Sequence, residues 1–149
     1  MADLVGKLMV VDMLPRPTAM YGGTRAGELA QALGQVAANP LGRQFLSAIV
    51  SAFTPAEDAG RGSDPDVVAR AMRDLGTIDL TADLARMRRP LTVVYAVSGE
   101  EARGPVARAF EQAYRGARGA RLVPVLQSGH LVMADQPQRF AAALRDFLR

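Results

Sequence analysis

Three apolar runs without polar alternation are the feature that most constrains the fold of this chain. They are Lys7 to Val11, Leu91 to Ala96 and Arg121 to Leu126. A strand with one face in water alternates apolar and polar residues, whereas a strand covered on both faces is apolar throughout. The runs therefore predict strands that are buried on both faces. The third run contains Pro124, which cannot donate a hydrogen bond to a neighbouring strand and so favours the sheet edge.

The segments beside these runs have helical spacing, which sets the direction of the strands. Between the second and third runs, apolar residues recur at helical spacing within Pro105 to Gly116. A strand–helix–strand unit of this kind joins parallel strands. A final amphipathic helix begins at Pro137. Its predicted apolar face consists of Phe140, Leu144, Phe147 and Leu148. Together these segments predict an α/β fold with a parallel three-stranded sheet.

The stretch between the first and second strands is too long to be a loop in a compact domain. It has three helical patterns and one short helical turn, which are Gly27 to Ala38, Leu41 to Phe53, Pro65 to Leu75 and Leu80 to Met87. We interpret the chain as a single domain, 1–149, in which residues 16–88 form a helical lid insertion. Function in parallel sheets collects at the carboxyl ends of the strands, and an insertion there can cover the site.

Composition excludes several classes of function. The 149 residues include no cysteine, so no disulfide or cysteine metal site is expected, and we predict no metal and no cofactor. No apolar run reaches the ~20 residues needed to cross a bilayer, and the start of the chain lacks a secretory pattern, which favours the cytoplasm. The net charge is +3, but basic residues are scattered along the sequence without interleaved aromatics. We therefore predict neither a nucleic-acid nor a membrane partner.

Two residues at the ends of predicted strands could carry chemistry. His130 is the only histidine, and it follows the third strand after a short Ser-Gly turn. Asp12 ends the first strand. If the strands are neighbours, both side chains emerge on the same rim of the sheet, where a carboxylate can orient an imidazole that acts as a general base. The alternative readings are a solvent-facing or capping histidine and a turn-forming or capping aspartate.

Glu100 is a second candidate for the acid. It follows the middle strand, in Ser98-Gly99-Glu100-Glu101. Adjacent glutamates before a helix commonly compensate the helix dipole, so we rank Glu100 below Asp12.

The order of these elements resembles the carboxyl-terminal half of an alpha/beta-hydrolase. The resemblance rests on a strand ending in Asp12, a helical insertion, a strand–helix–strand unit, and Ser128-Gly129-His130 followed by Asp135-Gln136-Pro137 before an amphipathic helix. It implies that His130 is the catalytic histidine. The family commonly places its acid in a Gly-x-x-Asp segment after the middle strand, where this chain has no aspartate. Some members place it after the preceding strand, which corresponds to Asp12.

The family's nucleophile motif, Gly-x-Ser-x-Gly, is not in this sequence. We therefore expect the chain to be the acid-and-histidine portion of a serine-type hydrolase of esters or related acyl compounds, inactive alone. The expected partners are a missing amino-terminal half and a small apolar ester in the intact enzyme. The alternative is a non-catalytic α/β binding or interaction module. An exposed edge of the first strand also makes a homodimer possible.

Overall fold

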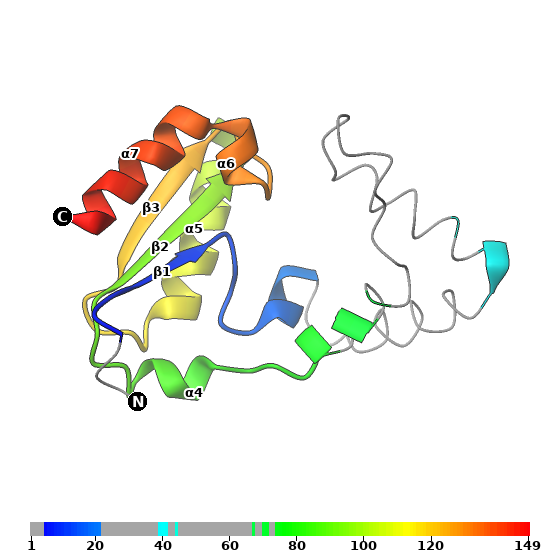
Figure 1. The fold of residues 1–149 in the computed structure, drawn as a ribbon, viewed down its shortest axis with the longest axis horizontal. Helices are drawn as coiled ribbons and strands as arrows, with labels where there is room; N and C mark the ends of the chain where they lie inside the picture. Colours follow the sequence, from blue (N-terminus) through cyan, green and yellow to red (C-terminus); the bar gives the residue numbers. More distant parts are fainter. Residues whose placement is uncertain (1–4, 22–38, 42–43, 45–66, 68–69, 72–73) are drawn as a thin grey trace. The chain divides into compact units, whose positions relative to one another are not determined.

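The computed structural model describes residues 5–21, 39–41, 44, 67, 70–71 and 74–149 (Figure 1). The chain divides into two compact units, one made of Met1–Pro15 with Asp79–Arg149 and the other of Arg16–Ile78. The first unit contains the sheet and the candidate site. It also contains residues 79–88, which the sequence assigned to the insertion.

A parallel three-stranded sheet forms the centre of the first unit, in the order β1-β2-β3. The strands are β1 (Leu8–Val11), β2 (Leu91–Val97) and β3 (Arg121–Leu126). In register, Val10 faces Val93 across β1 and β2, and Val94 faces Val123 across β2 and β3. The predicted strands and their parallel direction are confirmed. As expected from Pro124, β3 lies at an edge of the described sheet.

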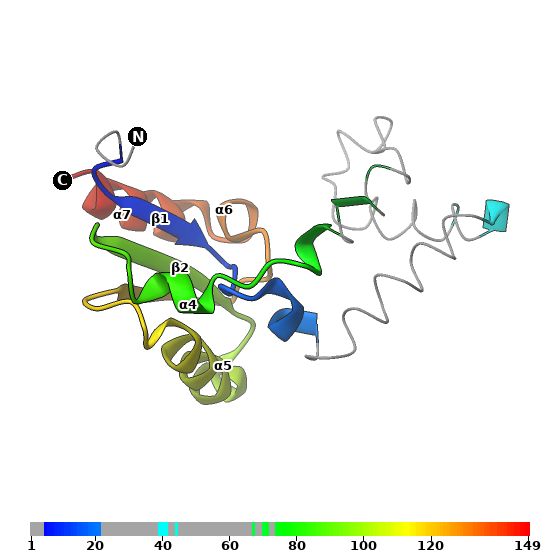
Figure 2. The ribbon, with the colours of Figure 1, turned by 90° about the horizontal axis from the view of Figure 1, so that it is seen from below.

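Helices cover both faces of the sheet (Figure 2). On one face lie α4 (Thr81–Leu84) and α5 (Glu100–Tyr114), and on the other lie α6 (Val132–Asp135) and α7 (Pro137–Leu148). This layering explains the apolar runs, because the central strand β2 has no face in water. Six of its residues are buried, and Ala96 is half-buried.

The two faces of β2 pack against different partners. Val94 joins a cluster with Val125, Val132 and Ala143 under α6 and α7. On the opposite face, the ring of Tyr95 stacks on a ring of α5. Burial of this apolar surface on both sides is the main contribution to the stability of the unit.

The ring stack on the α5 face runs from the sheet into the helix. The ring centroids of Tyr95 and Phe110 lie 4.4 Å apart, with 16° between the planes. Phe110 in turn stacks on Tyr114, with centroids 6.3 Å apart. These aromatic contacts fix the position of α5 over β2.

Two sequence predictions about the helices need correction. Helix α5 begins at Glu100 and not at Pro105, because acidic residues occupy its first turn and Pro105 is accommodated within the helix. In α7, the buried residue is Ala143, with Phe140 packed against the core, whereas Leu144 and Leu148 are exposed. Phe140 and Phe147 of the predicted face are thus partly buried as expected, whereas Ala143 takes the place predicted for Leu144 and Leu148.

The second unit is described only in part. A 3-10 helix spans Pro17–Tyr21. Leu41 and Gln44 are helical, and so are the described residues from Val67 to Leu75, in line with the two helices predicted there. The predicted helix over residues 27–38 lies outside the described residues. In the part of the chain that the structure describes, no helix is long and apolar enough to span a bilayer.

Tyr114 ties the end of α5 to the segment that follows β1. Its hydroxyl donates a hydrogen bond of 2.7 Å to the carbonyl oxygen of Met13, 101 residues away in sequence. Burial raises the pKa of Tyr114 to about 12, because the phenolate would lose its hydration. The folded chain therefore holds this proton more tightly than the unfolded chain, in which the pKa is ~10.

We expect Tyr114→Phe to destabilise the unit at neutral pH by ~1 kcal/mol, because the Met13 carbonyl loses its donor. Between pH ~10 and ~12 the unfolded chain releases the tyrosine proton while the folded chain retains it, so the free energy of unfolding of the wild type should fall in that range. The free energy of unfolding of the variant should fall less steeply over the same range. Urea unfolding at neutral pH and across this alkaline range measures both effects. Equal alkaline slopes for the two proteins would contradict the role assigned to this hydroxyl.

Candidate active site

Asp12 lies at the point where β1 ends and the chain turns away from the sheet. Its backbone N–H donates a 2.7 Å hydrogen bond to the carbonyl of Val94. Its φ is 45°, in the left-handed region that aspartate tolerates better than most residues. The side chain is only 8% exposed. Asp12 is thus a buried carboxylate that is placed at the carboxyl end of the strand.

The carboxylate of Asp12 completes the hydrogen bonding of β2. Strand β1 ends at Val11, so it offers no further carbonyl to the neighbouring N–H of Ala96. The Asp12 Oδ1 atom accepts that hydrogen bond at 2.8 Å. This backbone contact fixes one carboxylate oxygen and leaves the other, Oδ2, free to point along the rim of the sheet.

His130 provides the partner for Oδ2. Its Nδ1 atom lies 2.9 Å from Oδ2 of Asp12, although 118 residues separate the two in sequence. A carboxylate can only accept a hydrogen bond, so we assign the proton of the neutral ring to Nδ1. The other ring nitrogen, Nε2, is then an acceptor on a side chain that is 47% exposed. The ring has the geometry of an oriented general base.

The loop that carries His130 is held by backbone and side-chain contacts. Ser128 is buried, and its N–H donates to the carbonyl of Val97 at 3.2 Å, which anchors the loop to β2. Three side chains from the α6–α7 region bind its backbone. Asp135 Oδ2 accepts from Gly129 N–H at 2.7 Å, Gln136 Nε2 donates to the Gln127 carbonyl at 2.8 Å, and Arg139 Nη1 donates to the Leu126 carbonyl at 2.9 Å.

The position of Gly129 is sterically restricted as well. A Cβ atom at this residue would lie 3.2 Å from Oδ2 of Asp135, closer than ordinary van der Waals contact. Glycine therefore allows the carboxylate to approach the backbone directly. Gln127, two residues before Gly129, has a φ of 57°, which turns the chain sharply after β3.

The structure brings Asp12 and His130 together at one rim of the sheet, as predicted, although they follow β1 and β3, which lie on either side of β2. Glu100, the other candidate acid, is exposed in the first turn of α5, and its Oε1 accepts a 3.0 Å hydrogen bond from Arg103. This agrees with its reading as a residue of the helix N-terminus. The roles of Asp135, Gln136 and Arg139 were not predicted from the sequence. Their clustering just after His130 could have indicated that they bind its loop.

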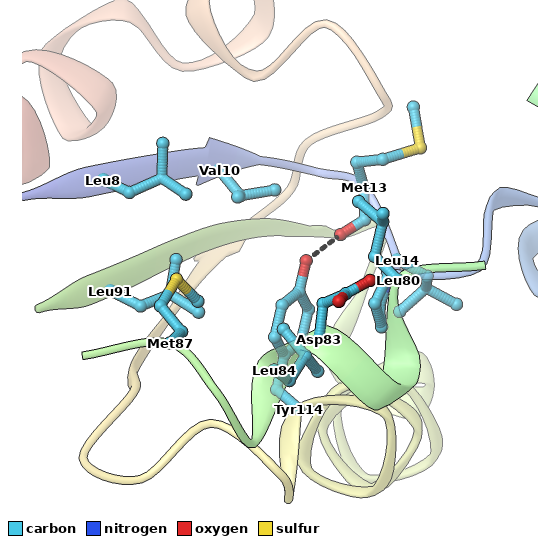
Figure 3. Close-up of a pocket in the computed structure, with 11 residues that line it drawn as sticks. Leu8, Val10, Met13, Leu14, Leu80, Asp83, Leu84, Met87, Leu91 and Tyr114 are labelled. Atoms are coloured by element: carbon cyan, nitrogen blue, oxygen red, sulfur yellow. Dashed lines mark hydrogen bonds between the residues drawn. The ribbon is translucent and has the colours of Figure 1, made fainter. Parts of the chain in front are cut away.

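A separate apolar cavity of about 250 Å³ lies on the α4 and α5 face of the sheet (Figure 3). Residues of β1, α4 and the segment after β1 line it, and Tyr114 closes one side with its hydroxyl directed to Met13. The carboxylate of Asp83 is the one charged group in the lining. The other lining residues are Leu8, Val10, Leu14, Pro15, Leu80, Leu84, Met87 and Leu91.

A parallel sheet with a carboxylate–imidazole pair on its carboxyl rim is an arrangement of α/β enzymes that use acid–base chemistry. The chain belongs to the alpha/beta hydrolase family, because the sequence profile of that family matches residues 1–143. A sequence comparison with curated proteins gives no significant match.

Several solved structures are similar in fold. A thermophilic esterase from Thermogutta terrifontis has a TM-score of 0.69 at 20% identity, over 97% of this chain and 56% of the esterase. Bromoperoxidase from Bacillus anthracis has a TM-score of 0.63 at 14% identity, over 99% and 69% of the two chains. NosK from Streptomyces actuosus has a TM-score of 0.55 at 26% identity, over 98% and 59%. The chain thus spans little more than half the length of the esterase.

We expect Asp135→Ala to loosen the histidine loop, because Gly129 N–H loses its acceptor. The expected cost is ~1 kcal/mol in the free energy of unfolding, with faster hydrogen exchange at the Gly129 amide. Asp135→Asn should restore most of the protection, since an amide oxygen can also accept this hydrogen bond. Denaturant unfolding and amide exchange by NMR measure the two effects.

Asp146→Ala is the matched control for this prediction. Asp146 is an exposed aspartate of α7, and it pairs with Arg121 at 3.4 Å. Loss of such a surface pair should cost at most ~0.5 kcal/mol and leave Gly129 exchange unchanged. If Asp135→Ala changed Gly129 exchange no more than this control, the role of Asp135 in holding the loop would be wrong.

Proposed function

We propose that Asp12 and His130 are the acid and base of a hydrolase triad that acts on esters or related acyl compounds. We further propose that the nucleophile belongs to a polypeptide segment outside these 149 residues. The observation that carries the proposal is the 2.9 Å contact between His130 Nδ1 and a buried carboxylate that is itself fixed by a backbone N–H. Membership of the alpha/beta hydrolase family supports it.

In the proposed reaction, Nε2 of His130 removes the proton of a serine hydroxyl as its oxygen attacks the substrate carbonyl. Asp12 stabilises the imidazolium and keeps the ring in the orientation that presents Nε2. The imidazolium then gives the proton to the departing alcohol, which leaves an acyl-enzyme. Water repeats the sequence with His130 as the base, releasing the acid and regenerating the serine.

The sequence supports a nucleophile from elsewhere, because it contains no Gly-x-Ser-x-Gly motif. The serine nearest to His130 in sequence, Ser128, is 3% exposed, and its hydroxyl donates to the Gly129 carbonyl at 2.9 Å. It is committed to the loop backbone. The family's elbow places its serine on a strand-to-helix turn.

The edge of β1 is the proposed place where the rest of the enzyme joins. Strand β1 pairs with β2 on one side and lies at the end of the described sheet. Leu8 on this strand is 41% exposed, and Val5 before it is 49% exposed. The apolar cavity, which Leu8 and Val10 help to line, lies against the same strand. The alternative is that a second copy of the chain pairs with the edge of β1. Light scattering of the purified chain distinguishes a dimer from a monomer.

A non-catalytic module that binds an apolar ligand is the second candidate function. The cavity beside β1 favours it, because its lining is almost entirely apolar. Met87→Trp would fill this cavity, since Met87 lies on its wall. If the chain is such a binding module, it should bind an apolar fluorescent probe, and Met87→Trp should abolish that binding.

We expect the 149-residue chain alone to resist labelling by a fluorophosphonate, which reacts with activated serines. Joining it to the amino-terminal region of a related hydrolase that contains a Gly-x-Ser-x-Gly turn should produce labelling and hydrolysis of a p-nitrophenyl ester. In the joined protein, Asp12→Asn should lower the rate by roughly 10⁴ fold and His130→Ala by roughly 10⁶ fold, as loss of the corresponding triad members does elsewhere. Labelling rates and ester assays measure these effects.

Glu100→Gln is the control in the joined protein, because Glu100 is the other candidate acid and carries the same charge. It should leave the rate within about twofold, as a surface change does. A rate loss with Glu100→Gln and none with Asp12→Asn would overturn the assignment of the acid. A labelled serine within residues 1–149 of the chain alone would overturn the proposal that the nucleophile lies outside it.

A further inference from the structure

The fold gathers basic residues that the sequence scatters. In the first unit, nine of them lie at the amino ends of the strands or in the segments that adjoin those ends. They are Lys7, Arg86, Arg88, Arg89, Arg115, Arg118, Arg121, Arg145 and Arg149. Parallel strands begin at the same edge of a sheet, and α7 runs back so that its last turn reaches that edge (Figures 1 and 2).

Contacts between these segments show that they form one end of the unit. The Nζ atom of Lys7 lies 5.2 Å from the ring centroid of Phe147 in α7. Arg121 at the start of β3 pairs with Asp146 of α7 at 3.4 Å. Beside them, the N–H of Leu8 donates to the Pro90 carbonyl at 2.9 Å, which joins the start of β1 to the segment before β2.

The fourth segment of this basic end is the connection between α5 and β3. A Cβ atom at Gly116 would lie 3.4 Å from the Cβ of Leu84, so this connection packs on α4. Arg115 and Arg118 therefore lie beside the segment that carries Arg86. All nine basic side chains are exposed.

Three acidic residues lie near this end in the part of the chain that the structure describes, and two of them are in ion pairs. Asp83 pairs with Arg86 at 2.8 Å, and Asp146 pairs with both Arg121 and Arg149. Glu111, in the last turns of α5, is the third acidic residue near this end within the described part of the chain. A strong positive excess therefore remains here, although the whole chain carries only +3.

The opposite rim of the sheet carries more acidic than basic residues. At or near the carboxyl ends of the strands, the carboxylates of Asp12, Glu100, Glu101 and Asp135 outnumber the guanidinium groups of Arg103 and Arg139. The first unit is therefore electrically polarised along its strands. A surface on which guanidinium groups outnumber carboxylates attracts polyanions at long range, and guanidinium binds phosphate oxygens in a bidentate manner.

An exposed apolar side chain lies among the basic ones, since Leu148 in the last turn of α7 is 64% exposed. The described aromatic ring at this end, Phe147, is partly buried beneath Lys7, so no platform for stacking bases is formed. Exposed aliphatic residues between cations are typical of proteins that bind at the surface of an anionic bilayer.

Although the scattered basic residues of the sequence predict no membrane partner, we propose that the basic end of the first unit, made of these nine residues, docks on an anionic phospholipid surface. Guanidinium groups would contact lipid phosphates, and Leu148 would enter the headgroup layer. The Asp12–His130 rim would then face away from the bilayer, because it lies at the other end of the strands. This proposal does not depend on the proposed hydrolase function.

Sedimentation of the chain with lipid vesicles tests the proposal. The chain should bind vesicles rich in phosphatidylserine and should not bind phosphatidylcholine vesicles. Raising the ionic strength from ~0.05 M to ~0.5 M should release most of it, since screening shortens the reach of the charges. The double variant Arg115→Gln, Arg118→Gln should bind at least roughly tenfold more weakly. Equal binding to the two kinds of vesicle would overturn the proposal.

The matched control is Arg103→Gln, Arg108→Gln, which removes the same charge from α5 outside the basic end. Its affinity for phosphatidylserine vesicles should stay within about threefold of the wild-type affinity, if the position of the lost charges matters and not only their number. Equal weakening by the two double variants would overturn the assignment of the surface. If a DNA duplex displaced the chain from vesicles and bound it more tightly than they do, the partner would be nucleic acid and the lipid proposal would be wrong.

Discussion

The carboxylate of Asp12 is the interaction on which the candidate site depends. One oxygen accepts the N–H of Ala96, which β1 is too short to satisfy, and the other accepts Nδ1–H of His130. A single buried side chain thus joins the ends of all three strands. Its two hydrogen bonds offset the cost of removing a charge from water. The same arrangement leaves Nε2 of His130 half in solvent, where a reacting group can reach it.

The rigidity of this pair comes from backbone contacts on both sides. Asp12 is held by the carbonyl of Val94 and the N–H of Ala96, and the histidine loop is held by side chains that follow it. Asp135 and Arg139 bind the loop from the α6–α7 region. The imidazole of His130 is therefore positioned by elements that fold around the same core cluster under α7. A packed scaffold of this kind favours precise orientation of a catalytic ring.

Much of the sheet was predictable from the sequence, because burial on both faces leaves a continuous apolar run. Arg121–Leu126 was predicted with its observed bounds. The approach of Asp12 to His130 was predictable from the strand ends, since all three parallel strands end at one rim and β1 and β3 both flank β2. The start of α5 was wrong because Pro105 is a strong local signal for a first turn, although two glutamates before it already favoured the helix. The predicted face of α7 was right for Phe140 and wrong for Leu144 and Leu148, because periodicity weighs large residues, whereas packing selected Ala143.

Other features depended on tertiary structure and could not be obtained from sequence spacing. The loop contacts of Asp135, Gln136 and Arg139 require the turn at Gln127, which has no strong sequence signature. The basic end is invisible in a linear reading, because its members come from four separate segments. The helices predicted in residues 27–53 lie mostly outside the described residues, so they stay predictions. What the sequence did indicate, the alpha/beta hydrolase family, is established by the match over residues 1–143.

The tautomer of His130 is the most direct test of the pairing between its Nδ1 atom and the Asp12 carboxylate. His130 is the only histidine, so the ¹⁵N signals of its two ring nitrogens are unambiguous in a histidine-labelled sample. At a pH where the ring is neutral, we expect a proton on Nδ1 and none on Nε2, because the Asp12 carboxylate can only accept a hydrogen bond. Asp12→Ala should return the ring to the Nε2–H form that free imidazole side chains favour in water. A wild-type ring protonated on Nε2, or one unaffected by the substitution, would contradict the pairing of Asp12 with His130.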